Sequence, residues 1–174
     1  MYLHLTGRNF LRPGASVLMD VDTSSMKKNT EKAVVARQAV RLPCACANLR
    51  RAARVMTRLY DAALRPSGLG VAQFTLLQAL TIAPGMSQKQ LAGLLEIDST
   101  TLTRTLAPLR HEGWLRSTAG DDRRELRLAL TAAGKRAYTR ALPYWERAQD
   151  EFIQALGAES WNRLMELSVQ TAAI

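Results

Sequence analysis

The chain has 174 residues, of which 47% are hydrophobic and 22% charged. This balance is typical of a folded globular protein and excludes a largely disordered chain. The 24 Lys and Arg residues against 15 Asp and Glu residues leave a formal net charge of +9, which favours an anionic partner such as nucleic acid or an acidic membrane surface.

The cysteine content and the hydropathy pattern narrow the class of protein further. The two cysteines, Cys44 and Cys46, are separated by one residue, so the chain has no framework of disulfides typical of a secreted protein. No apolar run reaches the roughly 18 residues that a membrane-spanning helix needs, and Arg8, Arg12 and Pro13 interrupt the N-terminus where a signal peptide would be apolar. We therefore expect a cytoplasmic protein with no membrane association.

Residues 1–42 differ from the rest of the chain. They mix Gly, Pro, Ser and Asn with basic residues and show no sustained hydrophobic period. We interpret them as a loosely ordered basic leader, and residues 43–174 as the folded domain.

Helical periods begin after the leader. Apolar residues recur at spacings of three and four over 46–64, with arginines on the other side, and Pro66 to Gly68 ends this helix. A second helix is predicted over 71–82, which ends before Pro84 and Gly85.

Two short helices follow in close succession. Ser87 and Gln90 have the spacing of a capping box, which predicts a helix start at Ser87. Asp98 is a favourable N-cap for a further helix, which carries Leu102, Leu106 and Leu109 on one face and ends at Gly113. The few residues between these helices predict a helix-turn-helix pair.

The period then changes to that of strands. Residues 114–116 and 126–130 are predicted to form a β-hairpin with a charged tip over 117–125. Thr131 begins a long helix to about Leu156, which we expect to kink at Pro143, and a last helix covers about 159–172. The predicted fold class is mainly α with a small β-hairpin wing.

The outward face of the second short helix is the first candidate site. With its three leucines buried, this face presents hydroxyls and one guanidinium near a helix N-terminus, groups that reach phosphates and base edges in a major groove. Its members are Ser99, Thr100, Thr101, Thr103 and Arg104. The alternative is that these side chains only cap and solvate an amphipathic helix.

The hairpin tip is the second candidate site. Asp122, Arg123 and Arg124 stand where a wing lies beside a DNA duplex, and Asp122 is a suitable partner to orient Arg124 into a minor groove. A solvated turn with compensating charges is the alternative.

The segment 44–173 resembles the MarR family of bacterial winged helix-turn-helix regulators. The resemblance is carried, in order, by the stretch from Ser87 to Ala92, the stretch from Asp98 to Arg104, Gly113-Trp114-Leu115, Asp122-Arg123-Arg124, and Leu130-Thr131 followed by Gly134. It implies a homodimer in which residues 43–65 and 132–174 supply the dimerisation helices and 70–131 the winged helix-turn-helix.

The resemblance also implies roles for single residues. Ser99, Thr101, Thr103 and Arg104 would contact the major groove and Arg124 the minor groove, while Ser87 and Gln88 would approach phosphates. Each dimer would read a pseudopalindrome of double-stranded DNA, most simply as a repressor that a small-molecule effector or oxidation releases.

The two cysteines are candidates for the sensing group. Cys46 stands before Arg54, Thr57 and Tyr60 at the spacings of the family's peroxide-sensing branch, although Arg50 replaces a second tyrosine of that branch. Arg50 and the amides of a helix N-terminus would favour the reactive thiolate. Small apolar residues packed at a dimer interface are the alternative interpretation of Cys44 and Cys46.

Other classes of function are less well supported. An enzyme with Cys46 as nucleophile lacks a base and an orienting group, because His111 falls in the predicted recognition helix. We therefore expect no enzyme activity, no cofactor and no metal site. A thiol-based redox or metal-binding protein, and a winged-helix module that binds protein instead of DNA, remain as alternatives.

Overall fold

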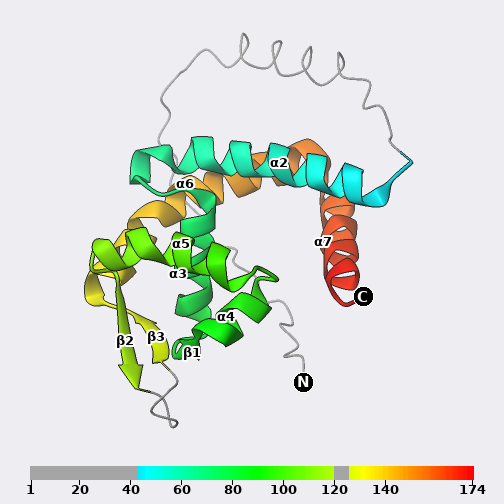
Figure 1. Ribbon diagram of the computed structural model, residues 1–174. Helices are drawn as coiled ribbons and strands as arrows, with labels where there is room; N and C mark the ends of the chain where they lie inside the picture. Colours follow the sequence, from blue (N-terminus) through cyan, green and yellow to red (C-terminus); the bar gives the residue numbers. More distant parts are fainter. Residues whose placement is uncertain (1–42, 120–125) are drawn as a thin grey trace, which may run out of the picture. The chain divides into compact units, whose positions relative to one another are not determined.

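The computed structural model describes residues 43–119 and 126–174. The predicted leader, 1–42, and the tip of the hairpin lie outside the described residues. In chain order the elements are α2 (Ala45–Leu64), the short 3-10 helix η1 (Arg65–Ser67), α3 (Val71–Ile82), β1 (Met86–Ser87), α4 (Gln88–Leu94), α5 (Ser99–His111), β2 (Leu115–Ala119), β3 (Leu126–Leu130), α6 (Ala132–Leu156) and α7 (Ala158–Ala172) (Figure 1).

These elements confirm the predicted fold class, a mainly helical protein with a small antiparallel sheet. The sheet has the order β1-β3-β2, and Leu115 pairs with Leu130 at the base of the wing. Two details of the predicted sheet were wrong. The short strand β1 was missed, because it is defined only by its pairing with β3, which is distant in the sequence. Strand β2 extends to Ala119, whereas only 114–116 were expected to form a strand.

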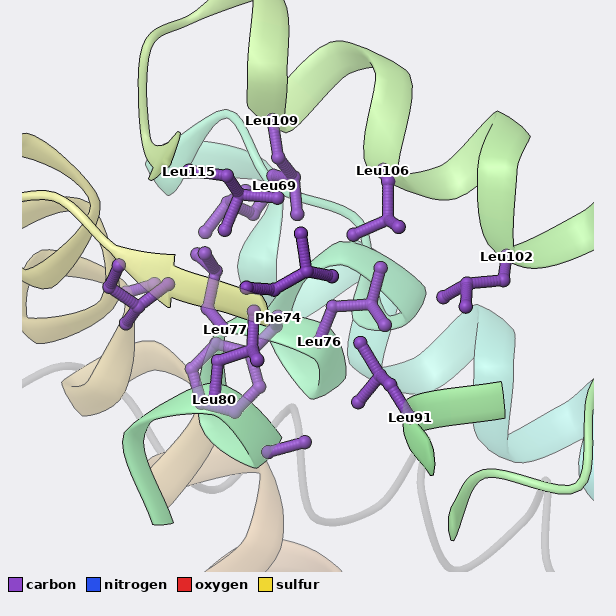
Figure 2. Packing of buried hydrophobic residues seen from close by; sticks show 14 of the residues in the cluster. Leu69, Phe74, Leu76, Leu77, Leu80, Leu91, Leu102, Leu106, Leu109 and Leu115 are labelled. Atoms are coloured by element: carbon purple, nitrogen blue, oxygen red, sulfur yellow. The ribbon is translucent and has the colours of Figure 1, made fainter. Parts of the chain in front are cut away.

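The core is built around α3 (Figure 2). Phe74 and Leu77 are fully buried, and the leucines of α5 pack towards them from above in the view shown. Each fully buried Leu contributes roughly 1.5–3 kcal/mol relative to an exposed one, so this cluster fixes the helix-turn-helix against the rest of the domain. The leucines of α5 that contribute are Leu102, Leu106 and Leu109.

The long helix α6 connects the core to the outer helices. Its Tyr138 and Trp145 stack on Phe74, with ring centroids 5.3 and 5.6 Å away. α2 runs alongside α6, and the hydroxyl of Tyr60 donates a hydrogen bond to Oε1 of Gln149. α6 is one continuous helix from Ala132 to Leu156 with Pro143 inside it, so the helix does not end at this proline, and the kink stays a prediction.

Much apolar surface of the outer helices is exposed in the single chain. α7 has no buried residue, and Val169 on it is 68% exposed. On α2, only Tyr60 and Leu64 are buried. Within the described residues, no helix combines the length and the apolar character that crossing a membrane requires.

Candidate nucleic-acid interface

The turn between α4 and α5 sets the angle of the helix-turn-helix. Leu95 ends α4, and the amide of Ile97 donates a 3.1 Å hydrogen bond back to the carbonyl of Ala92. Between them, Glu96 has a φ of 50°, in the left-handed region that residues other than glycine rarely adopt. The chain therefore reverses within three residues, and α5 begins directly after α4 ends.

The N-terminus of α5 is closed by Asp98. One carboxylate oxygen accepts the amide of Thr101 at 2.8 Å, and the other accepts the hydroxyl of Thr101 at 2.7 Å. The Thr101 hydroxyl, and after it the backbone amide, hold the pKa of Asp98 below its ordinary value because they stabilise the charged form. This arrangement gives Thr101 a structural task, since its hydroxyl proton is committed to the cap.

The remaining candidates on α5 face solvent. Ser99, Thr100, Thr103 and Arg104 are all exposed, on the side of the helix opposite its buried leucines. The hydroxyl of Thr103 donates to the carbonyl of Ser99 at 2.7 Å, so only its lone pairs are available to a ligand. Within residues 43–119 and 126–174, no acidic side chain forms an ion pair with Arg104. The guanidinium is thus available for an external acceptor.

The start of α4 contains the predicted capping box. Oγ of Ser87 accepts the amide of Gln90 at 3.2 Å, and the amide of Ser87 donates to the Gln90 side chain at 2.8 Å. Ser87 is only 4% exposed, which makes it a capping residue where the sequence suggested a phosphate contact. Gln88 is half-buried, whereas the adjacent Lys89 is exposed. Lys89 is therefore a further candidate for a phosphate contact, and its charge in the first turn of α4 is visible in the sequence.

The wing begins from strands β2 and β3. The last pair of their register is Ala119 with Leu126. The predicted tip residues Asp122, Arg123 and Arg124 lie outside the described residues.

The candidate sensing residues all belong to α2. Cys44 is its N-cap residue and Cys46 lies in its first turn, and both thiols are free and exposed. Tyr60 is buried, and its hydroxyl donates a hydrogen bond to Oε1 of Gln149. The fourteen residues from Cys46 to Tyr60 span about 21 Å of helix, so one chain does not bring these two side chains together.

Comparison with known proteins places this geometry in a family. The family model described as MarR family matches residues 69–126, the segment from α3 to the start of β3. The transcriptional regulator MosR of M. tuberculosis is 34% identical, and the alignment covers 76% of this chain and 98% of that one with a TM-score of 0.66. The chain belongs to the MarR family.

Other members of the family agree with this assignment. The MosR structure in complex with DNA is 38% identical, covering 75% of this chain and 94% of that one, with a TM-score of 0.67. A curated relative in Bacillus subtilis (strain 168), the uncharacterized HTH-type transcriptional regulator YwoH, is 30% identical over 90 residues. That match spans 52% of this chain and 66% of the relative.

The wild-type MarR of E. coli shares the fold at lower identity. Its apo structure is 22% identical and has a TM-score of 0.62 over 75% of this MarR-family chain. MosR and YwoH are both described as transcriptional regulators. The chain therefore belongs to a family of transcriptional regulators.

Proposed function

We propose that this MarR-family chain is a sequence-specific repressor that binds double-stranded DNA as a homodimer. The observation that carries the proposal is the exposed face of α5, where hydroxyls and the guanidinium of Arg104 lie in the first two turns of the helix, and where no acidic side chain of the described residues pairs with Arg104. Such groups match the phosphates and base edges of a major groove. The relative MosR, 38% identical, has been crystallised in complex with DNA.

In this proposal, some residues of α4 and α5 contact bases and others contact phosphates. Arg104 is the group suited to the O6 and N7 atoms of guanine, and Thr103 accepts from a base or a water. Gln88 and Lys89, in the first turn of α4, contact phosphates in this proposal, which is supported by the exposure of Lys89. Thr101 acts through the cap, holding the start of α5 in the position from which Ser99 and Thr100 approach the duplex.

The wing complements this helix in the proposal. Arg124 enters the minor groove with Asp122 as its orienting partner, and Arg123 contacts the adjacent backbone. This assignment rests on the sequence pattern, and on the antiparallel strands that lead to the tip on both sides.

The homodimer is supported by the apolar surface of the outer helices. Leu59 on α2 and Val169 on α7 are 37% and 68% exposed, and a partner chain that covered them would stabilise the pair by removing apolar area from water. Two copies of α5 would then read half-sites about one turn of DNA apart.

The oligomeric state provides the test of this part. In sedimentation experiments, Val169→Lys is expected to shift the protein towards monomer. Ile82→Lys is a matched control, because Ile82 is also 68% exposed but lies at the end of α3. A monomeric native protein would contradict the dimer.

DNA binding is tested with duplexes selected from a random pool by the native protein. We expect enrichment of a pseudopalindrome, and an affinity that falls linearly with salt on logarithmic axes because counterions are released. If the chain is instead a winged-helix module that binds protein, no duplex should be enriched. That result would contradict the proposal.

A second candidate concerns how DNA is released. Cys44 and Cys46 are both exposed at the first turn of α2, where a hydroperoxide reaches them freely. A thiolate attacks the O–O bond, which gives a sulfenic acid and an alkoxide or hydroxide, and a second thiol then displaces water to form a disulfide. Because Tyr60 lies about 21 Å along the same helix, this tyrosine does not lie beside Cys46 within one protomer.

Thiol sensing is tested by mobility shift with an organic hydroperoxide. We expect the oxidant to release native protein and Cys44→Ser protein, and to leave Cys46→Ser protein bound. Release of all three proteins to the same extent would remove Cys46 from the mechanism. Within the described residues, no group of three or more metal-ligating side chains supports the metal-binding alternative.

A further inference from the structure

Helix α2 carries a row of arginines that the proposed DNA-binding surface does not use. Arg50, Arg54 and Arg58 are spaced four residues apart, and all three are exposed. Residues four apart lie one above the other on a helix, about 6 Å apart along its axis, so the three side chains follow one side of α2 over about 12 Å. We call these three residues the arginine row.

The arginine row has no acidic partner in the part of the chain that the structure describes. Like charges four residues apart repel one another and destabilise a helix. Within residues 43–119 and 126–174, no acidic side chain forms an ion pair with a member of the row. Asp61 lies three residues after Arg58, and its carboxylate accepts the amide of Val71 at 2.7 Å. The row therefore offers its positive charges to an anion from outside the domain.

The row also lies away from the surface that the homodimer would use. Each residue advances about 100° around a helix. The large apolar residues of α2 that are exposed lie at least about 100° from Arg54 around the helix axis; they are Leu49, Val55 and Leu59. Tyr60, which bonds to Gln149 of α6, lies about 120° from Arg54. A partner chain that covers the apolar residues, together with α6, leaves the row in contact with solvent.

The DNA-binding surface lies elsewhere on the domain. In Figure 1, α2 runs along one end of the domain, whereas β2 and β3 lead to the other end. α2 packs on α6 and α3, while α5 packs on α3, α4 and β2. A duplex held by α5 and the wing therefore does not occupy the arginine row.

The row suits a line of phosphates. A guanidinium donates two parallel hydrogen bonds to one phosphate, and a duplex presents a phosphate at every nucleotide of each strand. Evenly spaced arginines on one side of a helix can follow such a line without contacting any base. An anionic membrane fits less well, because helices that lie in a membrane surface bury a broad apolar face, and the exposed apolar residues of α2 lie on other sides of the helix from the row.

We propose that the arginine row binds the phosphates of a second segment of double-stranded DNA, independently of its sequence. A homodimer that holds its selected duplex on α5 and the wing then has both rows available, and it bridges that duplex to another segment. A second segment of the same DNA molecule is present at high effective concentration, so a weak contact is sufficient. Bridging rests on the proposed function, whereas attraction of a duplex to the row does not.

The test uses the full chain, so that residues 1–42 are the same in every protein. Native protein is loaded with one duplex per dimer, selected from the random pool, and a fluorescent duplex of unrelated sequence is then titrated. We expect the second duplex to bind, with an affinity that falls linearly with salt on logarithmic axes. Absence of binding by the second duplex would overturn the proposal.

Two variants separate the row from general attraction to a basic protein. The row variant combines Arg50→Gln, Arg54→Gln and Arg58→Gln. The control removes the same charge from exposed arginines of α6 and α7, and it combines Arg140→Gln, Arg147→Gln and Arg163→Gln. We expect the row variant to bind the second duplex at least about tenfold more weakly than native protein, and the control to stay within about twofold. Equal losses in the two variants would overturn the proposal, and a urea midpoint checks that both fold.

This proposal and the repressor fail in distinguishable ways. The row variant should bind the selected duplex alone within about twofold of native protein, because α5 and the wing are unchanged. If native protein selects no duplex, the repressor proposal fails. The row is then tested with the unrelated duplex alone, to which the row variant should still bind at least about tenfold more weakly than the control.

Other partners of the row give different results. If the row contacts the partner subunit, the row variant shifts towards monomer in sedimentation experiments and the control does not. If the row binds a membrane, native protein binds vesicles of phosphatidylglycerol but not the second duplex. Either result would contradict a DNA contact at the row.

Discussion

The backbone of Gly134, in the first turn of α6, is packed directly against the backbone of Trp114, which precedes strand β2. A Cβ atom on Gly134 would overlap the carbonyl oxygen of Trp114 and come within 3.0 Å of its carbonyl carbon. The same carbonyl oxygen accepts the amide of Thr131 at 2.9 Å, and the hydroxyl of Thr131 donates to Gly113 at 2.8 Å. The start of the wing and the start of α6 are thereby joined through backbone atoms.

Gly134→Ala is expected to destabilise the fold. The overlapping atoms are backbone, which cannot rotate away, so we expect a loss of about 1–3 kcal/mol in the free energy of unfolding measured with urea. Gly93→Ala is the control, since Gly93 lies in α4 with no atom within 4 Å of the added Cβ. That change should be stabilising by about 0.5–1 kcal/mol. Equal effects of the two substitutions would contradict the close approach.

Local signals explain how much of this fold the sequence predicts. The helix over 71–82 and the strand over 126–130 were predicted with the bounds that the structure has, because their periods and flanking breakers are encoded in the segments themselves. The caps at Ser87 and Asp98 are local too, since each depends on a residue three positions along the chain.

Other features depend on contacts between distant segments. Strand β1 exists because Met86 pairs with Leu128. A strand of two residues is too short to show a hydrophobic alternation in the sequence. Helix α6 continues through Pro143 although proline removes one hydrogen-bond donor, which a local rule does not foresee. In the candidate site, the exposed face of α5 was predicted from its leucine spacing. The burial of Ser87 depends on the tertiary fold, so the sequence does not show it.

The cap at Asp98 predicts a pH dependence of stability. Because the folded state lowers the pKa of this carboxyl, the cap contributes stability above the ordinary pKa and loses it as pH falls through the lower, folded pKa. Native protein should therefore lose more stability than Asp98→Asn protein when urea unfolding is repeated from about pH 6 down to about pH 2.

The cause of that shift is tested at Thr101. Its hydroxyl is the largest contribution to the lowered pKa, so in Thr101→Val protein the carboxyl of Asp98 should titrate nearer its ordinary value by NMR. An unchanged titration would show that the backbone amide alone stabilises the charge.

We expect the hydrogen bond between Tyr60 and Gln149 to stabilise the packing of α2 against α6. Tyr60→Phe removes the donor and leaves the Gln149 oxygen without it, which should cost about 0.5–1.5 kcal/mol in unfolding free energy. Tyr144→Phe is the control, because Tyr144 is 37% exposed on the same long helix. In Gln149→Ala protein, Tyr60→Phe should cost less than in native protein, and additive effects of the two substitutions would argue that the bond contributes nothing.

Arg104 and Lys89 are expected to affect DNA binding in different ways. Arg104→Ala removes a group suited to a guanine edge, so it should cost about 1–3 kcal/mol on the selected pseudopalindrome and little on unrelated duplex. Lys89→Gln removes a group suited to a phosphate, so it should weaken binding to all duplexes alike and reduce the salt slope by about one per protomer. Arg163→Gln on α7, where Arg163 pairs with Glu166 at 3.2 Å, controls for the change in net charge. If Arg104→Ala also weakened every duplex equally, α5 would contact only the backbone, and sequence readout would have to come from the wing.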